Sequence, residues 1–392
     1  MIPSIAAAVA LFYALSSLAL ALLFAARLRI PDDRLSARVT LVMPATGLLP
    51  GLENLLTTLT VQSLRPHRLI VAVESREDPA YARLATFQHD SQLNIQLVVA
   101  GLSPLRSQKC TNLLAALANL QLDDDYIVLL DADIRPQPWW LAALVAPLAT
   151  GRADVVNGYR WPMPMILSAG TALVAGIDRA IAILPRLKQT RTIWGGSLAV
   201  SRRALEALDL PNTIGRTLTE DLPIGDRAAE TGLRVLTRRA VRPATPLSGS
   251  FGELWRFGRR QYQLIRLYRP GLWAFAAFVV STDLIARAVL LSSLATPGPA
   301  LAAILALACF GSIATEIRFA IGKKLGAADG IGFRISQHIL AWTILPTSGF
   351  HASVVWGGFV TSPVVWAHIR YIVDKTGQVI EVARRPHLDQ SI

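Results

Sequence analysis

Apolar stretches of membrane length lie at both ends of this chain of 392 residues. Residues 2–26 carry no charged side chain, and residues 272–294, 300–320 and 335–360 form three further apolar stretches. About 20 apolar residues are enough to cross the hydrocarbon core of a bilayer as a helix. The mean hydropathy of +0.41 is also too high for an ordinary soluble protein. These features predict a membrane protein with a large domain between its apolar ends.

Positive charges follow the first apolar stretch, at Arg27, Arg29, Arg34 and Arg38. A secretory signal peptide carries its positive charge before the apolar stretch, and basic residues beside a membrane helix mark the cytoplasmic side. We therefore expect an anchor with its N-terminus outside and the following domain in the cytoplasm. A cleaved signal peptide is the alternative.

The last apolar stretch, residues 335–360, has two interpretations. Its interruptions are Pro346, Gly349, Gly357 and Gly358. Lys323 and Lys324 precede it and a basic tail follows it, and both favour the cytoplasm. The stretch is therefore either a re-entrant hairpin, which the basic tail favours, or a single span.

Short apolar runs alternate with amphipathic stretches between residues 39 and 250. Predicted strands are 39–43, 69–73, 95–99 and 127–130, and predicted helices are 51–63 and 109–120. This alternation indicates an α/β domain with a mostly parallel sheet, in which ligands bind at the carboxyl ends of the strands. That rule places Thr46, Glu74 and Asp131 to Asp133 along one edge of the sheet.

Asp131-Ala132-Asp133 directly follows the apolar run 126–130. In an extended chain alternate side chains point to the same side, so both carboxylates can reach one ligand. Hard oxygen ligands suit Mg²⁺ or Mn²⁺, which often bridge to substrate phosphates. A solvated turn is the alternative for so short a motif.

The formal net charge of +12 could indicate a nucleic-acid partner. However, the basic residues flank apolar runs and no compact nucleic-acid motif accompanies them, so a membrane surface is favoured and no nucleic acid is expected. Cys110 and Cys309 lie far apart and share no metal-ligand spacing, which argues against a disulfide framework or a zinc site. The six histidines show no ligand spacing and receive no role.

Several short motifs follow one another in an informative order. They are residues 43–53 (MPATGLLPGLE), Asp78-Pro79-Ala80, residues 109–112 (KCTN), Asp131-Ala132-Asp133, Trp194-Gly195-Gly196-Ser197 and Thr219-Glu220-Asp221. Together they resemble the ceramide glucosyltransferase group of membrane glycosyltransferases (families 21 and 2), which includes hopanoid-associated bacterial members. The resemblance spans roughly residues 38–270 and implies an α/β, GT-A (Rossmann-like) catalytic domain.

The resemblance and the apolar stretches together predict five parts of the chain. These are an N-terminal transmembrane helix (1–28), a cytoplasmic GT-A domain (38–250), an amphipathic interface helix (251–270), transmembrane or re-entrant helices (271–365) and a cytoplasmic tail (366–392).

On the donor side, the resemblance implies that Asp133 binds Mg²⁺ or Mn²⁺ directly and that Asp131 contacts the ribose or the ion. Lys109 would meet the donor, and either Glu74 or Asp78 would contact the uridine. A diphosphate leaving group needs its charge neutralised by a cation, by Lys or Arg, or by both. The alternative for Lys109 is a solvated surface lysine.

On the acceptor side, the resemblance makes Asp221 the general base, a role that suits a carboxylate in a low-dielectric pocket. The alternative is an ordinary helix N-terminus, with Thr219 as its cap and the carboxylates favoured by the helix dipole. Further candidates beside the acceptor and the diphosphate are Trp194, Gly195, Gly196 and Glu220. Glycines permit a close approach of the backbone to a ligand, and a plain turn is the alternative.

A basic helical face lies just before the first C-terminal apolar stretch, formed by Arg256, Arg259, Arg260, Gln263 and Arg266. Such a helix usually lies among anionic headgroups at the membrane interface. The resemblance implies instead a Gln/Arg-x-x-Arg-Trp element beside the diphosphate and acceptor, with Arg260, Gln263 and Arg266 as candidates. The Trp is absent in both registers, because Leu267 follows Arg266 and Gln261 follows Arg260.

Asp283 and Arg287 are four residues apart inside an apolar stretch, where charges are costly and usually paired. A structural ion pair is preferred to a contact with a lipid acceptor.

The resulting expectation is an inverting glycosyltransferase that moves a sugar from a UDP-sugar to a lipid hydroxyl. It would act on the cytoplasmic face of a bacterial inner membrane, to which it is attached by several spans. The first alternative is a polysaccharide synthase, which would need more channel-forming helices. The second is a degenerate nucleotide-binding scaffold, which the incomplete Arg-Trp element would explain.

Overall fold

The computed structural model describes residues 1–31, 35–103, 105–295 and 298–385, so the predicted contribution of Arg34 lies outside the described residues. The chain divides into two compact units, which are described separately. The helical unit consists of Met1–Arg29, Trp161–Pro185 and Pro246–Thr361. The sheet unit consists of Ile30–Arg160, Arg186–Thr245 and Ser362–Ile392.

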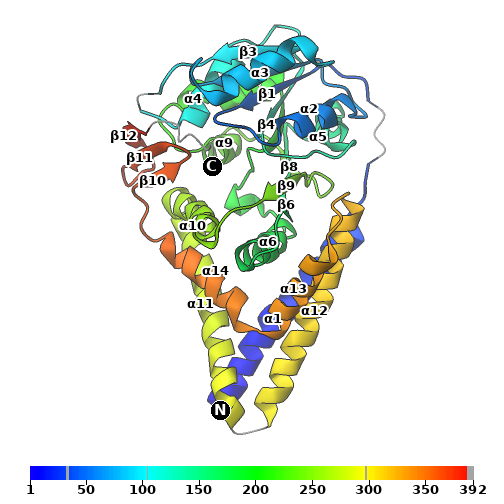
Figure 1. Cartoon of the computed structure of the whole chain (residues 1–392), viewed down its shortest axis with the longest axis vertical. Helices are drawn as coiled ribbons and strands as arrows, with labels where there is room; N and C mark the ends of the chain where they lie inside the picture. The colour runs from blue at the N-terminus through cyan, green and yellow to red at the C-terminus, as the bar shows by residue number, and fades with distance from the viewer. Residues whose placement is uncertain (32–34, 104, 296–297, 386–392) are drawn as a thin grey trace. The chain divides into compact units, whose positions relative to one another are not determined.

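The sheet unit is built on one seven-stranded sheet in the order β3-β2-β1-β4-β7-β5-β8 (Figure 1). Its strands are β1 Val39–Pro44, β2 Arg68–Val73, β3 Ile95–Val99, β4 Tyr126–Leu130, β5 Val155–Asn157, β7 Ser197–Ser201 and β8 Val235–Thr237. Strands β3, β2, β1 and β4 run parallel, whereas β7 is antiparallel to both β4 and β5. The four predicted strands and the mostly parallel sheet are confirmed.

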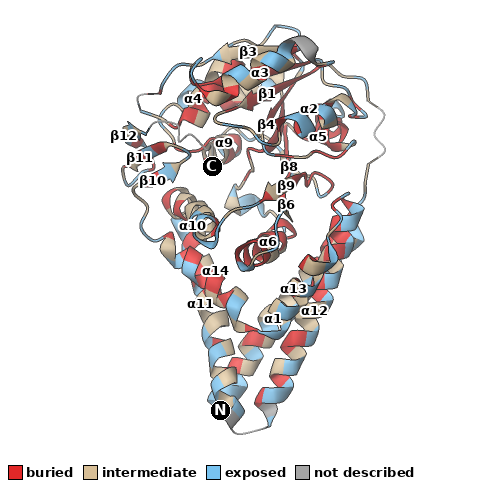
Figure 2. Ribbon diagram, viewed as in Figure 1, coloured by how far each residue is buried: buried red, intermediate tan, exposed pale blue. Residues whose placement is uncertain are grey.

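Helices cover both faces of this sheet, because its strand residues alternate between two apolar cores. Val39, Leu41 and Met43 of β1 join one core, whereas Val42 joins the other. The first core includes α2 Leu52–Thr60, α3 Pro79–Asp90 and α5 Trp140–Ala149. The second includes α4 Gln108–Leu117, α7 Arg202–Leu208, α8 Leu210–Thr213 and α9 Asp221–Glu230. Burial is continuous from Val39 to Met43 in β1 and from Ile127 to Leu130 in β4 (Figure 2).

The C-terminal segment of the sheet unit forms a three-stranded antiparallel sheet, which was not predicted from the sequence. Its strands are β10 Val364–Trp366, β11 Ile369–Val373 and β12 Val379–Arg384. The Tyr371 hydroxyl of β11 accepts a hydrogen bond of 3.0 Å from the backbone N–H of Gln108 in α4. Arg384 donates to the Ser103 carbonyl at 2.9 Å and to the Gln108 side chain at 2.8 Å. This segment is therefore attached to the large sheet's own helix layer.

The helical unit contains three helices that are long and apolar enough to cross a membrane. They are α1 Ile2–Arg27, α11 Pro270–Ser292 and α12 Pro299–Lys324. Helix α1 packs against both α11 and α12. The Tyr13 and Thr282 hydroxyls meet at 2.8 Å, and Lys324 donates to the Leu28 carbonyl at 2.6 Å. The apolar helices expected at both ends of the chain are confirmed, and the protein is a membrane protein.

The stretch at residues 335–360 belongs to two helices, α13 Ile331–Trp342 and α14 Leu345–Gly357, of 12 and 13 residues. The helical backbone is interrupted between them, and Ile344 has a positive φ of 39°. Neither helix reaches the roughly 20 residues that a span needs. The remaining elements of the helical unit include α6 Ala169–Ala182, α10 Phe251–Tyr268, the 3-10 turn Ser293–Ala295 and strand β6 Trp161–Pro164, which pairs with β9 Ala244–Leu247.

Candidate active site

The carboxyl end of β4 meets the start of β7. Leu130 pairs with Ser197, and the backbone N–H of Asp131 donates to the Gly196 carbonyl at 3.4 Å. Because β7 runs antiparallel to β4, the residues before β7 lie beside the residues after β4. Two motifs that are separate in sequence, Asp131 to Asp133 and Trp194 to Gly196, are thus neighbours in the fold.

Lys109 links this edge to the start of α9. Its Nζ atom lies 2.7 Å from Asp131 Oδ1 and 2.7 Å from Glu220 Oε1, and the Glu220 side chain is only 2% exposed. Helix α4 places Lys109 here because Ser107 caps the helix, accepting a hydrogen bond of 3.1 Å from the Cys110 N–H. The surface-lysine alternative is therefore wrong, since Lys109 is an ion-paired residue of the site.

The charges of this cluster shift its pKa values. Burial alone would lower the pKa of the Lys109 ammonium, but the charges of Asp131 and Glu220 outweigh burial and hold it well above its usual value. Burial raises the pKa of the Glu220 carboxyl, an effect that Lys109 partly opposes. Lys109 therefore stays protonated at any physiological pH and supplies a fixed positive charge.

Two glycines let the carboxylates approach the backbone before β7. A Cβ atom on Gly195 would lie 2.0 Å from Glu220 Oε1, and one on Gly196 would lie 2.6 Å from Asp131 Oδ2. Real Cβ atoms essentially never come this close to another heavy atom. Trp194 closes the other side, with its ring atom Cζ2 at 2.4 Å from the Gly196 Cβ position. A side chain at Gly195 would therefore displace the Glu220 carboxylate, and one at Gly196 would displace Asp131 or Trp194.

Asp133 is exposed to solvent. The pKa of its carboxyl is raised to about 6, first by desolvation and then by the negative charge of Asp131. The positive charges of Lys109 and Arg160 partly oppose this shift. Arg160 was not singled out from the sequence, because it belongs to no recognisable motif.

Asp221 is the first residue of α9, as the helix-start interpretation predicted. Its Oδ1 atom accepts hydrogen bonds from the Thr219 hydroxyl at 2.6 Å and from the Leu222 N–H at 2.8 Å. Thr219 does not cap the helix, however. Glu220 occupies the cap position without a side-chain cap bond, because its carboxylate turns to Lys109 instead. No hydrogen bond reaches Asp221 Oδ2 from the residues that the structure describes.

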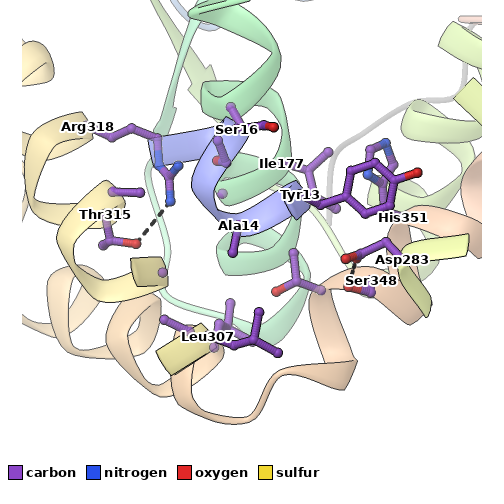
Figure 3. Close-up of a pocket in the computed structure, with 18 of the residues that line it drawn as sticks. Tyr13, Ala14, Ser16, Ile177, Asp283, Leu307, Thr315, Arg318, Ser348 and His351 are labelled. Carbon is purple, nitrogen blue, oxygen red and sulfur yellow. Dashed lines mark hydrogen bonds between the residues drawn. The ribbon is translucent and has the colours of Figure 1, made fainter. Parts of the chain in front are cut away.

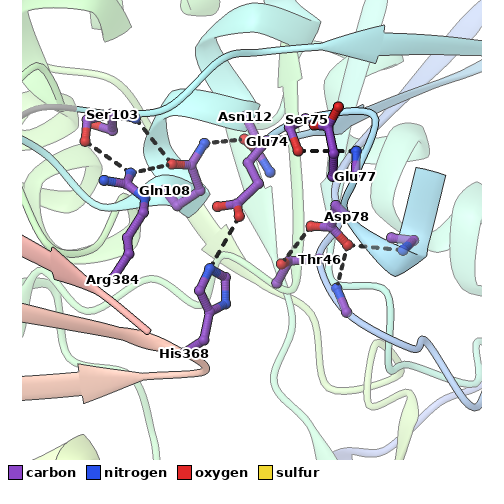
Figure 4. A network of polar contacts seen from close by, with 12 residues as sticks. Thr46, Glu74, Ser75, Glu77, Asp78, Ser103, Gln108, Asn112, His368 and Arg384 are labelled. Carbon is purple, nitrogen blue, oxygen red and sulfur yellow. Dashed lines mark hydrogen bonds and ion pairs between the residues drawn. The ribbon is translucent and has the colours of Figure 1, made fainter. Parts of the chain in front are cut away.

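The two carboxylates proposed for uridine have different surroundings (Figure 4). Asp78 is buried and accepts three hydrogen bonds of 2.8–2.9 Å, from the Thr46 hydroxyl and from the Gly47 and Ala80 N–H groups. It therefore anchors the loop after β1 and the start of α3. Glu74, also buried, follows β2, and its Oε1 atom lies 3.1 Å from His368 Nε2.

His368, next to the tip of the C-terminal sheet, is a site residue that the sequence did not reveal. It lies 294 positions from Glu74, so no local spacing could connect the two. Gln108 strengthens the same region, donating to the Gly101 carbonyl and to Asn112 at 2.8 Å each. Asn112 in turn donates to the Ala45 carbonyl at 3.0 Å, which fixes α4 against the end of β1.

The remaining predicted residues belong to α10 in the helical unit. Gln263 is buried and donates to the Val360 carbonyl at 2.7 Å. The Arg266 guanidinium stacks over Trp273 and Phe359, at 5.2 and 5.6 Å from their ring centres, and Arg260 lies 5.7 Å from the Phe257 ring centre. Within their own unit, Gln263 and Arg266 fasten α10 to the segment after α14.

The carboxylates fit a divalent cation that shares its ligands with a substrate. Across residues 1–31, 35–103, 105–295 and 298–385, no three His, Cys, Asp or Glu side chains converge as a metal cage. Mg²⁺ is commonly held by one or two carboxylates together with phosphate oxygens and water. Asp131 already pairs with Lys109, which leaves Asp133 as the carboxylate best able to hold such an ion.

Comparison with known families agrees with this geometry. The model for glycosyl transferase family 21 matches residues 2–379, which is nearly the whole chain. The chain belongs to this family. As a family 21 glycosyltransferase, it carries the GT-A-like α/β fold that its sheet order displays, together with apolar helices at both ends.

The solved structures that match this chain are distant in sequence. One is the mannosyltransferase PcManGT from Pyrobaculum calidifontis, in complex with GDP-Man and Mn²⁺, at 19% identity and a TM-score of 0.48, covering 87% of this chain and 99% of that one. Another is glucosyl-3-phosphoglycerate synthase from Mycobacterium tuberculosis, in complex with Mn²⁺ and UDP-glucose. It has 18% identity and a TM-score of 0.38, covering 59% of this chain and 78% of that one. No curated protein matches the chain.

Proposed function

We propose that this family 21 glycosyltransferase moves a sugar from a UDP-sugar to a hydroxyl group of a membrane lipid, with inversion at the anomeric carbon. The observation that carries the proposal is the cluster of Lys109, Asp131 and Glu220 beside Asp133 and Asp221. It sets a fixed positive charge beside a cation-binding carboxylate and a second carboxylate with a free oxygen. A leaving diphosphate needs the positive charge and the bound cation, and an attacking hydroxyl needs the carboxylate with the free oxygen.

On the donor side, Asp133 would hold Mg²⁺ or Mn²⁺, and the bound cation would neutralise charge on the diphosphate. Lys109 would direct its remaining N–H toward the same phosphates, while Asp131 and Glu220 keep it in place. Glu74, oriented by His368, would accept a hydrogen bond from the uracil ring. Asp78 would act indirectly, because its hydrogen bonds hold the loop after β1.

On the acceptor side, Asp221 would take the proton of the lipid hydroxyl through Oδ2, while Thr219 and the start of α9 hold Oδ1. The hydroxyl oxygen bonds to the anomeric carbon as the bond from that carbon to the diphosphate oxygen breaks. The electron pair of that bond leaves with UDP. A single displacement of this kind inverts the anomeric configuration.

A lipid acceptor fits a protein whose apolar helices hold it at the bilayer, where a headgroup can be modified without leaving the membrane. Arg27 at the end of α1, Arg29 just after it, and Lys323 and Lys324 at the end of α12 favour a bacterial inner-membrane protein whose sheet unit lies in the cytoplasm. Cysteine labelling tests this. Ser91→Cys in a Cys309→Ser background should be protected from an impermeant thiol reagent in intact cells, and labelling there would contradict the orientation.

The deciding experiment is to incubate membranes containing the protein with a panel of labelled nucleotide sugars and to separate the lipids. We expect label in a chloroform-soluble lipid, from one UDP-sugar, and at least about 100-fold less with Asp221→Asn. Label in a water-soluble polymer would favour the polysaccharide-synthase alternative. Nucleotide-sugar binding without any transfer would favour the scaffold alternative.

A further inference from the structure

A cavity of about 380 Å³ lies within the helical unit (Figure 3). Residues from six helices line it: α1, α6, α11, α12, α13 and α14. Its volume is at the lower end of the range for cavities that hold small organic ligands. No residue of the sheet unit lines it, so it is separate from the Lys109 cluster.

Arg318 of α12 enters this cavity with its charge unmatched. Its guanidinium donates a hydrogen bond of 3.0 Å to the Thr315 hydroxyl, and within the described residues it has no carboxylate partner. Neighbouring arginines of the unit are neutralised: Arg179 pairs with Asp329 at 2.7 Å, and Arg287 pairs with Asp283 at 2.9 Å. An arginine inside a membrane segment keeps its charge, so an unmatched one calls for an anion.

The depth of Arg318 indicates where that anion would come from. Arg318 is six residues before Lys324, the last residue of α12, which places it about 9 Å from the basic end of the helix. This is within reach of lipid headgroups. Beyond Arg318, the walls are largely apolar, with Leu20, Ile177 and Leu307 among the lining residues.

The far end of the cavity is polar but already satisfied. Both oxygens of Asp283 accept from Arg287 Nε at 2.9 Å, and the Ser348 hydroxyl donates to Asp283 at 2.7 Å. The His351 ring meets the Tyr262 hydroxyl at 2.6 Å. This end therefore adds no net charge, and Arg318 alone sets the charge that a ligand must complement.

We propose that the cavity binds one membrane lipid with an acidic headgroup, whose phosphate or carboxylate pairs with Arg318 and whose hydrocarbon lies along the apolar walls. The guanidinium can donate two parallel hydrogen bonds to either anion. The site does not depend on the proposed sugar transfer, because it uses no residue of the sheet unit. It makes an anionic lipid a component of the folded helical unit.

The test is a titration of the full-length protein in neutral detergent, followed by native mass spectrometry and by thermal unfolding. The probes are phosphatidylglycerol, phosphatidylcholine and glycerol 3-phosphate. We expect saturable binding of phosphatidylglycerol that raises the unfolding temperature, with much weaker binding of the other two. Equal binding of phosphatidylcholine would contradict the requirement for an acidic headgroup. Equal binding of glycerol 3-phosphate would contradict the requirement for a hydrocarbon chain.

Variants then locate the site. Arg318→Gln should weaken phosphatidylglycerol binding by about tenfold or more, the usual loss for a charge-assisted hydrogen bond. Lys323→Gln removes an exposed charge at the same end of α12 and should leave binding unchanged. Equal losses of phosphatidylglycerol binding in both variants would contradict the proposal, because the lipid would then be attracted only to the basic surface of the protein. If Arg318→Gln does not fold, Ala180→Phe, which fills the cavity without changing charge, should abolish binding, and retained binding there would overturn the proposal.

Discussion

The Lys109 ammonium lies 2.7 Å from the carboxylate of Glu220, although 111 positions separate them in sequence. The same ammonium contacts Asp131 at 2.7 Å, so one side chain joins the start of α4, the end of β4 and the residue before α9. Since Glu220 is almost wholly buried, its charge depends on Lys109 for compensation. Lys109 is therefore expected to contribute to the stability of the fold as well as to the chemistry of the site.

Replacing Lys109 by Met should lower both stability and activity. Removing one partner of a buried pair leaves an uncompensated charge, so we expect a loss of about 3 kcal/mol in the free energy of unfolding. Glu220→Gln removes the charge while keeping the shape, and the double variant should recover part of the loss. Lys375→Met, at an exposed lysine of the same unit, is the control. Additive losses in the double variant would show that the pair is not coupled.

Replacing Gly195 by Ala should disturb the same cluster from the opposite side. The added Cβ would lie 2.0 Å from Glu220 Oε1, the oxygen that pairs with Lys109, so the Glu220 carboxylate must shift. We expect a loss of about 1–3 kcal/mol, the usual cost of overpacking, and reduced transfer. Gly51→Ala is the matched control, because its Cβ would have open space. Equal unfolding temperatures for the two variants would contradict the close approach seen here.

The raised pKa of Asp133 predicts a pH dependence for cation binding. A cation needs the ionised carboxylate, so below about pH 6 its affinity should fall by up to about tenfold per pH unit. Titration with Mn²⁺ in the presence of UDP, between about pH 5 and pH 7.5, measures this fall. Asp133→Asn should bind weakly and show little of this dependence. A flat profile in the natural protein would remove Asp133 as the ligand.

Lower pH, which weakens cation binding at Asp133, should instead increase the contribution of Asp133 to folding stability. The folded-state pKa of Asp133, about 6, is above its ordinary value of 3.8, so the folded protein holds this proton more tightly than the unfolded chain. The contribution of Asp133 to stability is therefore complete below about pH 4 and is lost as the pH rises through about 6. Asp133→Asn should remove this loss, which unfolding measured across the same pH range would detect.

Local patterns predicted much of this fold. Apolar runs of four or five residues became β1 to β4, and the end of β4 carries Asp131 as the strand pattern required. The lengths of the apolar stretches predicted α1, α11 and α12 equally well, since a helix needs about 20 apolar residues to span a bilayer. The order of the motifs predicted the family, and each motif lies at the beginning or end of a strand or at the start of a helix.

Contacts between distant segments could not be predicted in this way. The pairing of His368 with Glu74 depends on where the C-terminal sheet packs, and that sheet is short and polar on one side. The capping pattern at Thr219-Glu220-Asp221 was also misleading. Its local preference suggested Thr219 as the cap, but the cap position is Glu220, whose carboxylate makes no cap bond because it pairs with Lys109 from another helix.

His368 is expected to act by positioning Glu74. His368→Ala should raise the KM for the UDP-sugar by about tenfold while changing kcat little, because a charged hydrogen bond is lost on the donor side only. Glu74→Gln should have a similar effect, and the double variant should lose little more. His67→Ala, at an exposed histidine of the same unit, is the control. A fall in kcat with unchanged KM would place His368 elsewhere in the reaction.

Asp221→Asn separates the proposed base from a merely structural helix start. The amide keeps the size of the side chain, and its oxygen can still accept from Thr219 and from the Leu222 N–H, so the unfolding temperature should hardly change. The basicity is lost, and the rate of transfer should fall by about 100-fold or more. Binding of the UDP-sugar should be nearly normal, since Lys109 and Asp133 are untouched. A purely structural role predicts the reverse, with a lower unfolding temperature and near-normal turnover. Measuring turnover, donor binding and unfolding on this one variant therefore decides the role, and a stable, fully active enzyme would exclude Asp221 as the base.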